Sequence, residues 1–245
     1  MLKLIKRSFY SPQAYGLIRV LLLLDVCFIA IHILVFFLYY IGQIDDYRNY
    51  NFLDVTNDGS LAEFFQYLKY FFVLIMLVHL VYSKKRYPYI SWFLLFAFFL
   101  LDDSLSLHET FGEVLVDAFN FQPMFGLRDL DFGELTFILS VGLILLSGLI
   151  IALIKGDSVF RKRTIDLLLL LLFFTYFGVG FDMLHVFLGE NPRVAFIIGI
   201  IEDGGEMVTM SVMVWYILYF LSSQDDDRNY LFRLLVPEQS IQKNH

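Results

Sequence analysis

The chain has 245 residues, of which 58% are hydrophobic and 18% are charged, and its formal net charge is −7. A soluble domain carries about 45–50% apolar and about 25% charged residues, so the composition argues against a soluble enzyme, and the acidic balance excludes a basic nucleic-acid-binding domain. The single cysteine, Cys27, excludes an internal disulfide and a metal cluster held by several cysteines.

Six apolar segments are long enough to cross a bilayer, because a transmembrane helix needs about 20 mostly apolar residues. In chain order we predict helices at residues 15–41, 61–82, 89–119, 134–154, 165–188 and 194–221. The third is apolar only to Leu101, and we extend it through the later apolar positions up to Phe119. The predicted fold class is therefore all-α: a polytopic membrane bundle forming one transmembrane domain, followed by a short cytoplasmic tail at 222–245.

Basic residues predict the orientation of this bundle. Thirteen Lys and Arg lie in the N-terminal segment, the second and fourth loops and the C-terminal tail, against three in the other loops. Loops rich in Lys and Arg stay on the cytoplasmic side of a membrane. We therefore expect both termini inside, with the acidic loops around Asp54 and Asp129 outside.

Acidic and histidine side chains interrupt three of the predicted helices. They are Asp102, Asp103, His108 and Glu109 on the third helix, Asp182 and His185 on the fifth, and Glu202, Asp203 and Glu206 on the sixth. At a rise of about 1.5 Å per residue the three groups overlap in the outer half of the membrane. A charged side chain at mid-membrane costs about 2.5–3.5 kcal/mol, so these groups must be paired, protonated, hydrated or bound to metal.

A divalent metal is the leading hypothesis for these nine residues. Carboxylates with imidazole suit Fe, Mn or Zn. Asp182-x-x-His185 is related to the Glu-x-x-His motif of di-iron bundles, and Glu202 and Glu206 share a helix face. This hypothesis favours a metal-dependent membrane enzyme acting on a lipid or small apolar substrate. The alternatives are a proton- or cation-coupled transporter or channel, and a structural subunit of a membrane complex or homo-oligomer.

Lys69, Asp25, His32 and His79 are further polar residues within the predicted spans. Lys69 is a candidate counter-charge for the acidic cluster, or it extends outward to the lipid headgroups. Asp25, His32 and His79 are interpreted as residues that hydrogen-bond helices together. Gly204 and Gly205 are interpreted as small residues that allow tight helix packing. The alternative is a local break in the sixth helix.

The motif set resembles an uncharacterised family of bacterial multi-pass membrane proteins. That family carries an acidic pair, a His-Glu pair shortly after it and a Glu-Glu-x-x-Glu-Met-like helix, which correspond here to Asp102-Asp103, His108-Glu109 and the run 202–207. The resemblance implies the same fold and site and a location in the bacterial cytoplasmic (inner) membrane, but no reaction. The expected surroundings are a lipid bilayer, with no nucleic acid.

Overall fold

The computed structural model describes residues 12–124, 127–188 and 191–222. Regular structure there is helical, apart from one isolated antiparallel bridge between Met124 and Leu127. The α-helices are α2 (Pro12–Tyr40), α3 (Leu61–Tyr82), α4 (Ile90–Leu105), α5 (Leu107–Phe119), α6 (Asp129–Lys155), α7 (Ser158–Thr175), α8 (Phe181–Leu188) and α9 (Pro192–Ser222). Two 3₁₀ turns, η1 (Tyr47–Leu53) and η2 (Tyr87–Tyr89), and a π-helical turn, η3 (Tyr176–Gly180), complete the elements. The predicted tail lies outside the described residues beyond Ser222.

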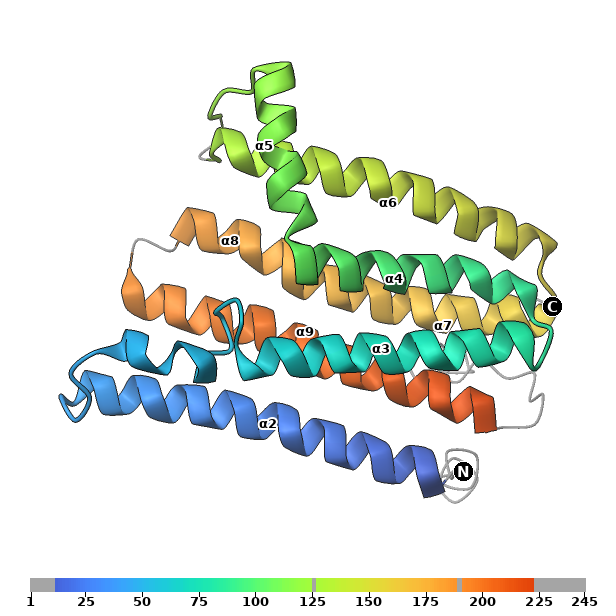
Figure 1. The fold of residues 1–245 in the computed structure, drawn as a ribbon, viewed down its shortest axis with the longest axis horizontal. Helices are drawn as coiled ribbons and strands as arrows, with labels where there is room; N and C mark the ends of the chain where they lie inside the picture. The colour runs from blue at the N-terminus through green and yellow to red at the C-terminus, as the bar shows by residue number, and fades with distance from the viewer. Residues whose placement is uncertain (1–11, 125–126, 189–190, 223–245) are drawn as a thin grey trace, which may run out of the picture.

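Six helices are long and apolar enough to cross a membrane, which confirms the predicted number within the described ranges. They lie side by side along the long axis of the molecule (Figure 1). The first described residues of α2, the last of α9 and the turns before α4 and α7 lie at one end. We call these two turns the basic turns, because Lys84, Lys85 and Arg86 lie in the first, and Lys155 and residues 161–163 flank the second. The loop after α2, the helix α5 and the start of α9 lie at the opposite end.

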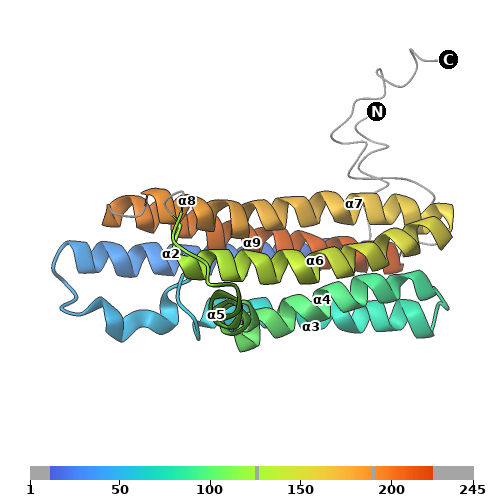
Figure 2. The same ribbon diagram turned by 90° about the horizontal axis from the view of Figure 1, so that it is seen from above.

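The third predicted helix, 89–119, is in fact two helices. Ser106 adopts a left-handed conformation, with φ 46° and ψ 48°, and separates α4 from α5. The carboxylate of Asp102 accepts a 2.9 Å hydrogen bond from the backbone N–H of His108 and so satisfies an exposed donor at the start of α5. α5 then runs across the bundle, and Figure 2 shows it end-on. The span therefore ends at Leu105.

The fifth predicted helix, 165–188, also has different bounds. It begins at Ser158, because the carboxylate of Asp157 accepts a 2.7 Å hydrogen bond from the backbone N–H of Phe160 and caps the helix. The π-helical turn η3 then follows α7 and precedes α8. A π-helical turn inside an α-helix frequently accompanies a functional site.

α9 is the central helix of the bundle. Of the residues in its most apolar stretch, 61% are buried, against 6% for α6 at the periphery. It packs against α2, α3, α7 and α8. α9 continues without a break through Gly204 and Gly205, which lie against Ile29 and Phe177. The glycines therefore serve close packing at the point where α9 carries its acidic residues.

Candidate functional site

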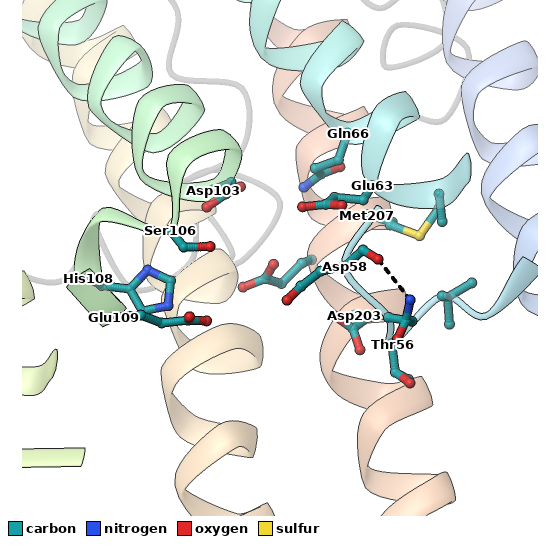
Figure 3. Close-up of a pocket in the computed structure, with 14 residues that line it drawn as sticks. Thr56, Asp58, Glu63, Gln66, Asp103, Ser106, His108, Glu109, Asp203 and Met207 are labelled. Atoms are coloured by element: carbon teal, nitrogen blue, oxygen red, sulfur yellow. Dashed lines mark hydrogen bonds between the residues drawn. The ribbon is translucent and has the colours of Figure 1, made fainter. Parts of the chain in front are cut away.

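A cavity of about 190 Å³ lies where α4 ends and α5 begins. Its walls come from the loop before α3, the first turns of α3, the α4–α5 break and the middle of α9 (Figure 3). The rim of the cavity is formed by the exposed residues Thr56, Asp58 and Glu109. Inside it lie four half-buried acids, Glu63, Asp103, Asp203 and Glu206. The floor is formed by the buried residues Ala62, Gln66 and Met207. Six carboxylates thus share one cavity, which we call the acidic pocket.

The helix break at Ser106 places one wall of the acidic pocket. His108 and Glu109 begin α5 and line the pocket, whereas Asp102 lies behind them and is buried. The Nδ1 atom of His108 is 3.3 Å from an Asp102 carboxylate oxygen. The adjacent Asp102 carboxylate raises the pKa of His108, burial opposes this, and the negative charges of Glu134 and Glu109 add to the increase. Asp102 therefore positions the wall and favours a charged imidazole.

A second wall is the loop before α3, which is held by Asp54. One oxygen of its carboxylate accepts hydrogen bonds from the Thr56 N–H (2.9 Å) and the Thr56 hydroxyl (2.8 Å) and lies 3.0 Å from Nδ1 of His32. Burial alone would raise the pKa of Asp54, but these contacts outweigh it and lower the pKa to about 2. Burial and the nearby Asp54 charge raise the pKa of Tyr47, whose hydroxyl lies 3.3 Å from His32. His32 thus joins α2 to the pocket loop.

Glu63 is fixed at the start of α3 by the chain around it. Ser60 caps the helix by accepting a 3.2 Å hydrogen bond from the Glu63 N–H. The Glu63 carboxylate accepts in return from the Gly59 N–H and from the Tyr67 hydroxyl. The Tyr67 hydroxyl also lies 3.0 Å from the Asp103 carbonyl oxygen, so this contact ties α3 to the end of α4.

Glu206 reaches from α9 towards the π-helical turn η3. A Cβ atom added to Gly178 in that turn would lie 1.9 Å from Oε1 of Glu206. Only a residue without a side chain leaves room for the carboxylate at this place. Gly178 therefore determines where the Glu206 carboxylate lies.

Gln66 is a buried polar residue in the pocket floor. The residue is 6% exposed, its amide nitrogen neighbours the Tyr70 hydroxyl, and its amide oxygen is buried without a hydrogen-bond donor among the described residues. Leaving a buried donor or acceptor unsatisfied costs about 1–3 kcal/mol. Figure 3 shows Gln66 on the pocket side of α3, close to Glu63. The floor of the acidic pocket thus offers an unused acceptor, the amide oxygen of Gln66.

Lys69 has a partner other than the acids of the pocket. Its Nζ atom lies 2.8 Å from Oδ1 of Asp25, and both side chains are fully buried. Nζ also donates to the Met207 carbonyl at 2.9 Å, and Ser211 donates to the other Asp25 oxygen at 2.6 Å. The side chain therefore neither extends to the headgroups nor pairs directly with the predicted cluster.

The structure brings five of the nine predicted metal-site residues to the acidic pocket. These are Asp103, His108, Glu109, Asp203 and Glu206. Asp102 supports the pocket from behind, and Glu202 does not line it; the side chains of Asp182 and His185 lie outside the described residues. Among the side chains that are described, no three His, Cys, Asp or Glu residues are arranged to hold one metal ion directly.

Among the pocket residues that sequence reasoning missed are Asp58, Glu63 and Gln66. Asp58 and Glu63 flank the turn before α3, where acidic residues are ordinary solvated or capping groups. A signal was present in Ser60-x-x-Glu63, a capping box that predicts an ordered helix start.

Residues 26–221 match a protein family described as a domain of unknown function, DUF8692. The chain belongs to this family. The matched range contains every residue that lines the acidic pocket. No curated protein and no solved structure matches the chain. Membership of DUF8692 agrees with the expected resemblance to a family without an assigned function.

Proposed function

We propose that this protein is a multi-pass membrane protein that binds a hard divalent cation in the acidic pocket, on the outer side of the membrane. The six apolar helices support insertion into a bilayer. The basic turns before α4 and α7 lie at the end opposite the pocket, which supports cytoplasmic termini and an outward-facing site.

The chemistry of the lining favours a cation that prefers oxygen ligands. Six carboxylates line the pocket, and the hydroxyl groups of Thr56 and Ser106 and the amide oxygen of Gln66 add neutral oxygens. Carboxylate, carbonyl and water ligands suit Mg²⁺, Ca²⁺ and Mn²⁺, whereas Zn²⁺ and Fe²⁺ sites use more nitrogen or sulfur. The His108 imidazole, the one nitrogen ligand on the described lining, faces Asp102.

The pocket is suited to a cation that keeps part of its water shell. No three acidic or histidine side chains among the described residues meet at one point, yet the cavity of about 190 Å³ has room for water around an ion. Mg²⁺-like ions lose water reluctantly and bind through one or two carboxylates with several waters retained. The observation that carries the proposal is the buried amide oxygen of Gln66, which has no donor among the described residues and lies among these carboxylates.

Transport of the cation is a second candidate function, favoured by one further observation. The fully buried Lys69–Asp25 pair lies next to the pocket, because Lys69 donates to the backbone of Met207 on the pocket floor. Ionisable pairs inside membrane bundles commonly belong to ion or proton pathways. Cation binding is common to both candidate functions, so it is tested first.

Electron paramagnetic resonance of Mn²⁺ tests the proposal, since only free hydrated Mn²⁺ gives the sharp six-line signal. Titration of the purified protein in lipid nanodiscs should show a saturable site, with competition by Ca²⁺ or Mg²⁺. Glu206→Gln should weaken Mn²⁺ binding at least about tenfold, which corresponds to 1.4 kcal/mol. The matched control is Asp117→Asn, because Asp117 is an exposed acid of α5 that does not line the pocket. Equal loss in both variants, or no saturable binding, would contradict the proposal.

A further inference from the structure

The pair formed by Lys69 and Asp25 joins three helices in the middle of the bundle. Lys69 on α3 contacts Asp25 on α2 at 2.8 Å and the Met207 carbonyl of α9 at 2.9 Å, and the Phe65 ring lies 4.6 Å from Nζ. Ser211 of α9 completes the site by donating to Asp25 at 2.6 Å. Neither charged side chain is exposed, so both have given up their water.

This pair is adjacent to the acidic pocket but separate from its lining. Met207 belongs to the pocket floor through its side chain and contacts Lys69 through its carbonyl. Gln66 precedes Lys69 by one helical turn. The charged group that faces Lys69 is Asp25. The six carboxylates of the acidic pocket lie on the other side of the Met207 floor, and among the described residues none of them forms an ion pair with Lys69.

The buried positive charge of Lys69 lies next to the proposed cation site, so the two positive charges must repel each other. Water screens little between a buried ammonium and an ion in a half-enclosed pocket, so a divalent cation there repels the Lys69 charge. Loss of one proton from the pair removes the repulsion, because the pair changes from neutral to singly negative. Replacing a buried ion pair with apolar residues is often neutral or stabilising, so stability alone gives little reason for this pair in the fold.

We propose that the Lys69–Asp25 pair is a proton-binding site coupled to the acidic pocket, and that entry of a divalent cation expels one proton from Lys69. This inference rests on the proposed cation binding. In the step, one N–H bond of the Lys69 ammonium breaks, the electron pair stays on Nζ, and water takes up the proton. No oxidant or reductant takes part; one divalent cation is gained and one proton is lost, so the net charge of the protein with its ion rises by one.

Coupling of this kind has a reciprocal signature. If binding releases one proton, the affinity for the cation must rise with pH, and Kd must fall by up to about tenfold per pH unit. The pocket carboxylates can also release protons when the cation binds. The contribution of Lys69 is therefore the difference between the wild-type protein and variants in which Lys69 cannot titrate.

Lys69→Arg is the first test, because a guanidinium keeps the positive charge but does not lose its proton. Mn²⁺ is added to protein in weakly buffered nanodiscs, bound Mn²⁺ is counted by electron paramagnetic resonance, and released protons are counted with a pH indicator. Lys69→Arg should release about one proton fewer per bound Mn²⁺ than the wild type. It should also bind Mn²⁺ more weakly, because its charge cannot leave.

The double variant Asp25→Asn with Lys69→Met is the second test and avoids an unpaired buried charge. It should also release about one proton fewer per Mn²⁺ than the wild type, because neither side chain can titrate. The same change in proton count in two variants of different chemistry, with Mn²⁺ still bound, distinguishes coupling from a general loss of structure. Tyr216→Phe is the control, because it removes a buried 2.6 Å hydrogen bond to Asp166 that lies away from the pocket.

The outcomes separate the two proposals. Unchanged proton release in either folded variant, with Mn²⁺ still bound, would overturn the coupling and leave the proposed function intact. No Mn²⁺ binding by the wild type would overturn both. Two variants of different chemistry are used so that misfolding of one leaves the other decisive, and a loss of proton release in Tyr216→Phe as well would also count against the coupling.

Discussion

The position of the Glu206 carboxylate depends on the absence of a side chain at Gly178. Glu206 lies on the central helix, and its carboxylate occupies the space that a side chain at Gly178 would fill. The neighbouring Gly180 in the same π-helical turn is different, because a Cβ atom there would meet Tyr176 at an ordinary 3.5 Å. The two glycines therefore form a matched pair for testing.

We expect Gly178→Ala to weaken Mn²⁺ binding at least about fivefold, about 1 kcal/mol, while the protein still folds. The added methyl group must displace the Glu206 carboxylate, which ends a flexible side chain, so the backbone need not move. Gly180→Ala should leave the Mn²⁺ affinity within about twofold of the wild type. Titration with Mn²⁺ measures both variants, and similar affinities in the two would show that Glu206 takes no part in binding.

Site residues could be predicted from the sequence where a charged side chain lies in an apolar helix. Asp103, Asp203 and Glu206 stand out because acids in apolar helices are expensive. The partner of Lys69 was not predictable, since Asp25 is one helix away in sequence and 44 positions earlier. Helix periodicity gives the depth of a residue, but its facing within a bundle depends on packing against the other helices.

At the scale of elements, the decisive feature is the break at Ser106. The left-handed Ser106 turns the chain so that His108 and Glu109 face Glu63 and Asp203 across the pocket. A straight helix to Phe119 would carry these residues further along the axis of the bundle instead. The apolar run ends at Leu101, but the prediction extended the helix to Phe119, and the sequence has no glycine or proline there to predict the turn.

Helix α5 is held in its crossing position by contact with α6. A Cβ atom added to Gly133 would lie 2.3 Å from the Gly112 carbonyl oxygen, and one added to Gly112 would lie 2.9 Å from Cγ of Glu134. The two glycines thus allow the backbones of α5 and α6 to touch. Because α5 carries one wall of the acidic pocket, this contact also sets the width of the pocket.

We expect Gly133→Ala to lower the free energy of unfolding by about 1–3 kcal/mol, because the methyl group would overlap the backbone of α5. Gly142→Ala on the same helix is the control. A Cβ atom there meets nothing within 4 Å, and alanine favours helix by about 1 kcal/mol over glycine. Thermal unfolding in detergent, followed by circular dichroism, measures both variants. Equal midpoints would indicate that α5 is not anchored on α6.

At the scale of the whole molecule, charge and polarity are separated between the two ends of the bundle. The acidic pocket lies at one end, and the basic turns lie at the other. The number of spans followed from apolar length, and the prediction at 61–82 agrees with α3 at both ends. The pocket itself required the fold, because it gathers groups from a loop and four helices that lie between Val55 and Met207 in the sequence.

Orientation in the membrane decides which side supplies the cation, and accessibility of single cysteines can determine it. In a Cys27→Ala background, Gln122→Cys marks the pocket end and Ser83→Cys the basic end; both positions are exposed. With cytoplasmic termini, a membrane-impermeant maleimide should label Gln122→Cys in intact cells and Ser83→Cys only after permeabilisation. The reverse pattern would place the acidic pocket in the cytoplasm. Labelling of both from outside would mean that α4, which connects the two positions, does not cross the membrane.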